Sequence, residues 1–220
     1  MRELDAVLLD IDGTLLYSND QHARAFVLAA EEMGVAHPGF EAVRRMIGMG
    51  GDKLVPRAFG FELESPRGEE IDRRKGRLFR TLFVSELRPT EGARDLVERL
   101  KSDGLRLVVA TSAGGDDLDL LLGRAGVADL IDDCTTSSDV EESKPAPDLV
   151  EAAAALAGVP PERCVMIGDT PYDVEAATRA GVRIIGVRTG GWTAAELAGS
   201  IAVYDHPAAI LANYARGSLI

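Results

Sequence analysis

Cysteine is nearly absent from the sequence. Its 220 residues include only Cys134 and Cys164, which are not spaced as a Cys-x-x-Cys motif. Both fall in or beside apolar stretches typical of strands, so we expect two buried, free thiols. Free thiols fit a reducing compartment, and we therefore expect a cytoplasmic protein.

Long apolar runs and an excess of basic residues are also missing. Residues 1–5 lack the apolar core of a signal peptide, and no run approaches the length of a membrane-spanning helix. The 24 Lys and Arg residues stand against 36 Asp and Glu residues, which gives a net charge of −12. We therefore expect no nucleic-acid or membrane partner, and an anionic substrate needs a local positive site.

What the sequence does contain is typical of a globular α/β protein. Hydrophobic residues make up 46% and charged residues 27%, and this length suits one large domain or a core with a smaller insertion. From residue 92 onward, strand patterns alternate with helical ones, which predicts a mostly parallel sheet with right-handed crossovers. The strands are expected at 106–110, 131–136, 163–167, 183–187 and 201–204, and the helices at 92–102, 116–125, 148–157, 174–180, 194–197 and 208–214.

The segment between residues 19 and 86 shows no strand pattern. Its helices are expected at 20–33, 40–47, 52–59 and 67–86. Such an all-helical block is too long for an ordinary crossover between two strands. We therefore predict an inserted helical cap domain at 16–87, and an α/β core formed by 1–15 and 88–220.

The most informative stretch is an apolar run, Ala6 to Leu9, that leads into Asp10 and Asp12. The run predicts a strand buried on both faces, and ligands of open α/β sheets bind beyond the carboxyl ends of the strands. Two carboxylates this close repel each other, so both stay ionised only if a cation such as Mg²⁺ lies between them. One can then act as a nucleophile and the other as general acid and base. The alternative is an ordinary turn, since Asp and Gly are common turn formers.

Three later segments carry polar groups at strand ends or in the loops that follow. Thr111 and Ser112 close an apolar strand pattern, where a hydroxyl and backbone N–H groups can hold a phosphoryl oxygen. Lys144 can offset the charge of a carboxylate and a phosphate. Asp169 and Asp173 follow another buried strand and can complete a Mg²⁺ site. Each also has an ordinary explanation: a threonine after a strand is common, a loop lysine is usually solvated, and an aspartate can cap a helix.

Together these segments resemble the four motifs of the haloacid dehalogenase-like superfamily, in the same order. Asp-Ile-Asp-Gly-Thr-Leu at 10–15 is similar to the first motif, Thr-Ser at 111–112 to the second, Ser-Lys-Pro-Ala-Pro-Asp at 143–148 to the third and Gly-Asp-x-x-x-Asp at 168–173 to the fourth. The resemblance covers the whole chain and points to the phosphoglycolate phosphatase and β-phosphoglucomutase-like group. It implies a Rossmann-like parallel core with an inserted helical cap, and hydrolysis of a small phosphomonoester.

The resemblance also implies a mechanism with an aspartyl-phosphate intermediate. Mg²⁺ would be held by Asp10, by the backbone carbonyl of Asp12 and by Asp169. Asp173 would either orient these ligands without binding the metal itself or pair with Lys144. Asp10 would attack phosphorus, and Asp12 would protonate the leaving alcohol and then activate water.

Substrate contacts are implied in both expected domains. Thr111, Lys144 and the backbone N–H of Ser112 would hold the transferring phosphate. The cap would set specificity and exclude water, with His22 on its first helix and Lys53 after a Gly-Gly pair as candidate contacts. Ordinary explanations are packing for the histidine and surface charge for the lysine. The expected partner is a small phosphorylated metabolite, and the expected state is a monomer or homodimer.

Asp12 bears on the choice within the superfamily. The dehalogenase branch lacks this second acid, and the phosphonatase branch usually carries Ala there with a cap lysine, for which Lys53 would be the candidate; both are disfavoured. A β-phosphoglucomutase-like phosphomutase shares the first and third motifs and stays the main alternative, although its fourth motif more often has two adjacent acids. A non-catalytic binding protein is a further alternative, against which the intact acids and lysine argue. Phosphoglycolate, a sugar phosphate and a nucleotide monophosphate all stay open as substrates.

Overall fold

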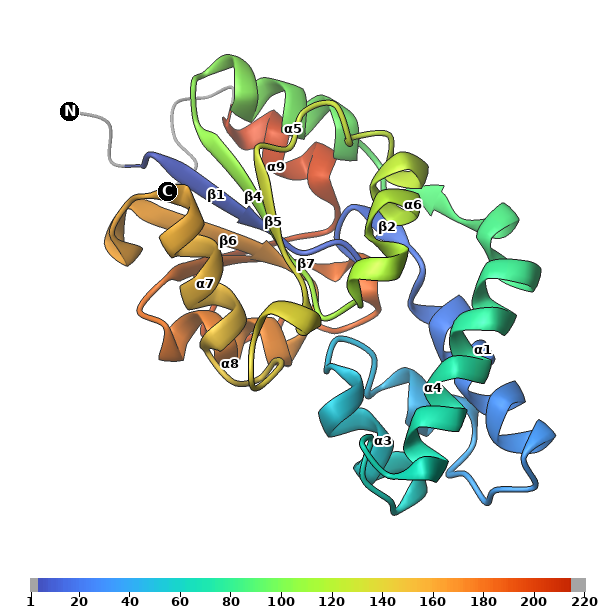
Figure 1. Ribbon diagram of the computed structural model, residues 1–220. Coiled ribbons are helices and arrows are strands. Elements are labelled where there is room, and N and C mark those ends of the chain that lie inside the picture. Colours follow the sequence, from blue (N-terminus) through green and yellow to red (C-terminus); the bar gives the residue numbers. More distant parts are fainter. Residues whose placement is uncertain (1–3, 215–220) are drawn as a thin grey trace. The chain divides into compact units, whose positions relative to one another are not determined.

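The computed structural model of this protein describes residues 4–214. The chain forms two compact units. One unit contains the chain up to Tyr17 together with the chain from Arg88 onward, and the other runs from Ser18 to Leu87. Within the described residues, every strand belongs to the first unit, and the second is built from helices and turns (Figure 1).

The main sheet has six parallel strands in the order β5-β4-β1-β6-β7-β8. Their bounds are β1 Ala6–Leu9, β4 Arg106–Ala110, β5 Asp133–Thr135, β6 Cys164–Gly168, β7 Arg183–Val187 and β8 Ala202–Tyr204. The predicted α/β class with a parallel sheet is confirmed. Central strand β1 is buried along its whole length, as its apolar sequence predicts.

Helices cover both faces of this sheet (Figure 1). They are α5 Ala93–Ser102, α7 Asp148–Ala157, α8 Pro171–Arg179 and α9 Pro207–Tyr214. The same unit also contains α6 Gly115–Ala125 and short 3₁₀ turns at Ser137–Asp139, Pro161–Arg163 and Arg188–Gly190. Because successive side chains of a strand point to opposite faces, Ala6 and Leu8 share one buried cluster with Leu149 of α7 and Ala177 of α8. Helices α5 and α9 lie on the other side of the sheet.

The strand register brings polar residues together at the carboxyl ends of the central strands. Leu9 of β1 pairs with Val109 of β4 and with Ile167 of β6. The segments that follow these three neighbouring strands begin at Asp10, Thr111 and Asp169, and they therefore leave the sheet side by side. Open parallel sheets bind their ligands beyond the carboxyl ends of their strands.

Several local predictions for the first unit need correction. A small antiparallel pair, β2 Leu16–Tyr17 with β3 Arg88–Pro89, was not among the predicted strands. The helix expected at 194–197 is a turn, because a single turn is closed by hydrogen bonds before Gly199 takes a positive φ of 108°. The strand expected at 131–136 is limited to β5, and its Cys134 is half-buried rather than buried, since β5 is an edge strand.

The second unit contains α1 Asn19–Glu32, α2 Phe40–Arg44, α3 Gly51–Phe59 and α4 Pro66–Leu78. The helix predicted over 67–86 is present, but it is α-helical only as far as Leu78. Helix α4 is followed by a π-helical turn, Phe79–Phe83, and a 3₁₀ turn, Val84–Glu86. The hydroxyl of Thr81 donates to the carbonyl of Arg77 four residues earlier, a contact that competes with regular helix hydrogen bonds.

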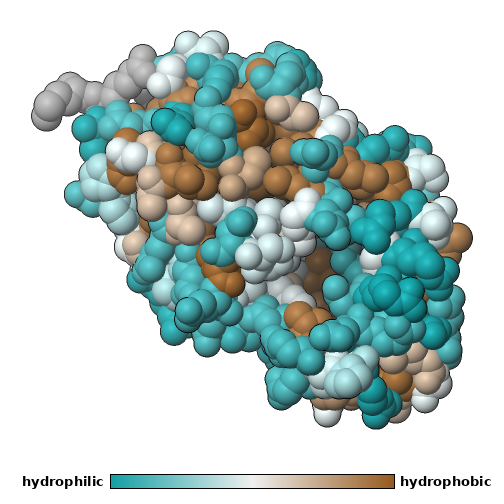
Figure 2. All heavy atoms as spheres, viewed as in Figure 1, coloured by the Kyte–Doolittle hydropathy of each residue, from teal (hydrophilic) through white to brown (hydrophobic). Residues whose placement is uncertain are grey.

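The surface near α4 is strongly polar. Glu70 forms ion pairs with Arg73 and Arg74 on this helix, and hydrophilic side chains dominate this part of the space-filling view (Figure 2). Across residues 4–214, no helix combines the length and the apolar character that crossing a membrane requires.

Candidate active site

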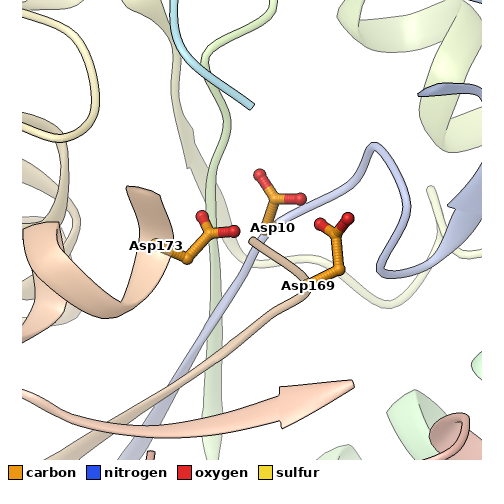
Figure 3. Close-up of side chains that lie close together, drawn as sticks. All are labelled: Asp10, Asp169 and Asp173. Carbon is orange, nitrogen blue, oxygen red and sulfur yellow. The ribbon is translucent and has the colours of Figure 1, made fainter. Parts of the chain in front are cut away.

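Three buried carboxylates converge beyond the carboxyl ends of β1 and β6 in the main sheet. Asp10 follows β1, Asp169 follows β6, and Asp173 lies in the first turn of α8. Each offers an oxygen, and these oxygens lie within 4.8 Å of one another (Figure 3). Carboxylates at this spacing are suitable ligands for a divalent cation.

A single buried lysine balances part of this negative charge. Lys144 is fully buried, and its Nζ lies 2.6 Å from Oδ1 of Asp10 and 2.7 Å from Oδ1 of Asp173. Burial alone would lower the pKa of Lys144, but these two carboxylates raise it above the ordinary value. The side chain is therefore a fixed ammonium ion within the carboxylate cluster.

Asp173 is held by the start of its own helix. Its Oδ2 accepts hydrogen bonds from the backbone N–H of Thr170, at 3.0 Å, and from the hydroxyl of Thr170, at 2.7 Å. Thr170 is the N-cap of α8 and accepts in return from the N–H of Asp173, which forms a capping box. With Oδ1 facing Lys144, Asp173 fits the expected role as the partner of that lysine.

Asp169 is fully buried between a hydroxyl and a glycine. The hydroxyl of Thr14 donates to Oδ1 of Asp169 at 3.2 Å. On the other oxygen, a Cβ added to Gly190 would lie 1.7 Å from Oδ2. The carboxylate therefore occupies space that any other residue at position 190 would fill.

The pKa of Asp10 reflects its burial and the charges around it. Burial raises the pKa of Asp10 most, Lys144 lowers it, and Asp173 and Asp12 raise it again, with a net value of about 7. Three carboxylates against one ammonium leave an excess of buried negative charge. A divalent cation beside Asp10 and Asp169 would offset that excess, so the donor set fits Mg²⁺.

Asp12 lies in the tight turn after β1. Gly13 has a positive φ of 82° there, which a residue with a side chain rarely adopts, and its N–H donates to the carbonyl of Leu16. Asp12 is half-buried, and it lies near enough to raise the pKa of Asp10. The close carboxylate cluster contains Asp173 and not Asp12, for which we expected a contribution through the backbone carbonyl.

Thr111 and Ser112 follow β4, the strand beside β1. Thr111 is buried; its N–H donates to the carbonyl of Thr135, and its hydroxyl oxygen accepts from the N–H of Ala113 at 3.1 Å. A hydroxyl that accepts one bond keeps its own hydrogen for an anionic ligand. Ser112 is half-buried.

The other two predicted contacts belong to the unit formed by 18–87. His22 is buried in α1, and its ring stacks on Phe79 with 4.0 Å between the ring centroids. Lys53 is half-buried in α3, with its Nζ 3.6 Å from a carboxylate oxygen of Asp52. Their contact with substrate stays a prediction.

Four supporting residues were not singled out from the sequence. Thr14 is part of the first motif but was assigned no role, and Thr170 lies between the two acids of the fourth. Gly190 and Thr90 lie outside every motif. The hydroxyl of Thr90 donates to the carbonyl of Thr14 at 2.6 Å, across 76 positions of sequence. Contacts of this kind follow from the fold and leave no local sequence signal.

Known proteins share both the sequence and the architecture of this chain. A model of the haloacid dehalogenase-like hydrolase family matches residues 4–181. The chain is 32% identical over 211 residues to a phosphoglycolate phosphatase of Rhodospirillum rubrum, which covers 91% of this chain and 86% of that protein. It also resembles the crystal structure of a hydrolase from Pseudomonas syringae, with a TM-score of 0.89, 28% identity and coverage of 97% of this chain and 99% of that chain.

A further relative is much longer than this chain. The chain is 36% identical over 193 residues to Protein SUPPRESSOR OF QUENCHING 1, chloroplastic, of Arabidopsis thaliana. The match covers 85% of this chain and only 18% of that protein. The family model nevertheless spans most of the sequence and all four motifs, and the chain therefore belongs to the haloacid dehalogenase-like hydrolase family.

Proposed function

We propose that this hydrolase is a Mg²⁺-dependent phosphatase that acts on a small phosphomonoester of the phosphoglycolate or sugar phosphate type. The observation that carries the proposal is the buried ammonium of Lys144 between Asp10 and Asp173, beside Asp169. The similarity to a phosphoglycolate phosphatase supports a small phosphorylated substrate. In this proposal the reaction passes through an aspartyl-phosphate at Asp10.

Asp10 and Asp169, with the backbone carbonyl of Asp12, would hold Mg²⁺. The ion would neutralise charge on the carboxylates and on the phosphate oxygens. Support comes from Asp10, whose pKa is raised to about 7 chiefly by burial and further by the nearby carboxylates Asp173 and Asp12; a neighbouring cation would favour its ionised form. Oxygen ligands are the type that Mg²⁺ prefers.

The side chains themselves would perform two displacements at phosphorus. A carboxylate oxygen of Asp10 attacks phosphorus, the bond to the leaving oxygen breaks, and Asp12 gives that oxygen a proton. Asp12 then takes a proton from water, whose oxygen attacks the phosphorus and releases phosphate and Asp10. Support comes from the position of Asp12 in the turn that follows Asp10, where its side chain is half-buried rather than enclosed.

The phosphoryl oxygens need cationic and hydroxyl donors throughout. An ammonium group has three hydrogens, and Asp10 and Asp173 face two of those of Lys144. The third can donate to a phosphoryl oxygen. The hydroxyl of Thr111, at the end of the neighbouring strand, would supply a second donor.

The test is phosphate release from a panel of small phosphomonoesters, with and without Mg²⁺. Wild type should release phosphate only with Mg²⁺, and Asp10→Asn should abolish release. Asp119→Asn changes an exposed acid of α6 and is the control, with unchanged turnover expected. Release that survives Asp10→Asn would contradict the nucleophile. Interconversion of a sugar 1-phosphate and 6-phosphate without phosphate release would assign a phosphomutase instead.

A further inference from the structure

Thr90 joins two segments of the first unit that are far apart in sequence. It directly follows β3, which pairs with β2, and its side chain is only 2% exposed. Its hydroxyl donates to the carbonyl of Thr14 at 2.6 Å, and its N–H donates to the carbonyl of Leu15 at 3.0 Å. Two consecutive carbonyls of the first-motif loop are thus fixed by one residue.

The loop residue that Thr90 fixes also contacts the carboxylate cluster. Thr14 accepts from Thr90 through its carbonyl and donates through its hydroxyl to Oδ1 of Asp169. Both hydrogen bonds are buried. Because the hydroxyl and the carbonyl belong to the same residue, holding the carbonyl of Thr14 fixes the backbone from which its side chain reaches Asp169.

On its other side, Asp169 is closely approached by the backbone at position 190. The backbone of Gly190 approaches so closely that an added Cβ would lie 1.7 Å from Oδ2. If the hydroxyl of Thr14 turned away, Oδ1 of Asp169 would lose its contact with that hydroxyl. Thr14 therefore contributes to the orientation of Asp169, and Thr90 to the position of Thr14.

We propose that Thr90 is a positioning residue for the cation site, acting through Thr14 to orient Asp169. The inference rests on the proposed function, in which Asp169 is a Mg²⁺ ligand. Partners that orient metal ligands affect metal affinity by roughly 10- to 100-fold. Thr90 holds the loop through two hydrogen bonds, of which one is lost when its hydroxyl is removed, so the lower end of that range is expected.

The experiment measures the Mg²⁺ requirement in two ways. One is the Mg²⁺ concentration that gives half of the maximal rise in melting temperature, and the other is the concentration that gives half-maximal phosphate release. Thr90→Val removes the hydroxyl and keeps the shape, and it should raise both concentrations about tenfold. Thr90→Ser restores the hydroxyl and should stay within about twofold of wild type. If Thr90→Val does not fold, the smaller Thr90→Ala takes its place.

A matched control separates positioning from packing. Thr135 is also 2% exposed, and its hydroxyl also donates to a backbone carbonyl, that of Val109. Thr135→Val should lower the melting temperature of the metal-free protein and leave the Mg²⁺ requirement unchanged. An equal change in Mg²⁺ requirement for Thr135→Val and Thr90→Val would overturn the positioning role.

A double-mutant cycle tests the route through Thr14. Thr14→Val should raise the Mg²⁺ requirement, and adding Thr90→Val to it should change the requirement little further. Fully additive effects would overturn the route. A wild type that responds to Mg²⁺ in neither measurement contradicts the proposed function, whereas a responsive wild type with an equally responsive Thr90→Val contradicts only the role of Thr90.

Discussion

The ammonium nitrogen of Lys144 lies 2.6 Å from Oδ1 of Asp10, and both side chains are buried. The two residues are 134 positions apart. Their contact brings a fixed positive charge to the carboxylate that we propose as nucleophile. Oδ1 of Asp173 lies 2.7 Å from the same ammonium nitrogen, so removing the lysine affects two acids together.

Lys144→Met should abolish most activity and weaken the fold. The variant leaves two buried carboxylates without their cation, which costs about 3–5 kcal/mol when a buried pair loses one partner. Loss of the donor to the phosphoryl group should lower kcat by roughly 100- to 1,000-fold. Denaturant unfolding of the metal-free protein and phosphate release with saturating Mg²⁺ measure the two effects.

The control for that variant is a lysine in an exposed ion pair. Lys101 pairs with Asp132, and both side chains are about one-third exposed. Exposed pairs contribute about 0–1 kcal/mol, so Lys101→Met should change stability little and leave kcat unchanged. Equal losses of stability in the two variants would show that the buried Lys144 pair contributes no more to the free energy of unfolding than an exposed pair does.

Mg²⁺ affinity should depend on pH through Asp10. Burial, opposed by Lys144 and reinforced by Asp173 and Asp12, raises the pKa of Asp10 to about 7 in the metal-free protein. Below that pH the carboxyl carries a proton that must leave before it can bind a cation. Mg²⁺ affinity should therefore rise as pH increases from 6 to 7 and level off above pH 8. Titration of Mg²⁺ at several pH values measures this, and an affinity that is constant over the range contradicts the raised pKa.

Gly190→Ala should disturb the site without removing any polar group. The added Cβ would lie 1.7 Å from Oδ2 of Asp169, so the carboxylate must move. We expect kcat/KM to fall by about 100-fold, which is the typical cost of a shift of about 1 Å in a catalytic group. Gly123→Ala is the control, since its Cβ meets no atom within 4 Å in helix α6, and it should be active and slightly more stable. Normal kinetics in Gly190→Ala would show that the orientation of Asp169 does not matter.

Asp12→Asn should discriminate between leaving groups. An alkoxide needs a proton to depart, whereas p-nitrophenolate does not. In the first turnover, the variant should release an alkyl alcohol about 100-fold more slowly than wild type and p-nitrophenol with a much smaller loss. Rapid-mixing measurements of alcohol release test this. Equal losses for both substrates would remove Asp12 from the role of general acid.

Local sequence was enough to predict the fold class and the family, because both depend on strong local patterns. The apolar run before Asp10 predicted the central strand, and the regular alternation after residue 92 predicted the parallel sheet. The helix expected over 67–86 is found, but the local pattern did not predict its change to a π turn around Thr81, whose hydroxyl bonds to the carbonyl of Arg77. The helix at 194–197 failed because an apolar pattern of four residues cannot distinguish a helix from a turn.

The candidate site could be predicted only as far as its motifs reach. The residue types and the strand ends indicated which acids and which lysine would gather, and the structure brings Asp10, Lys144, Asp169 and Asp173 together. The support from Thr90 could not be foreseen, because a threonine hydroxyl that bonds a distant carbonyl has no spacing or composition of its own.

The measurement that tests the nucleophile most directly is chemical trapping of the phosphoryl enzyme. The protein is quenched in acid during turnover, treated with borohydride, which reduces an acyl phosphate on aspartate to homoserine, and mapped by mass spectrometry. We predict homoserine at position 10 in wild type with substrate and Mg²⁺, and none without substrate or in Asp10→Asn. Full turnover with no modified Asp10, or with the modification at another residue, would contradict the proposed mechanism.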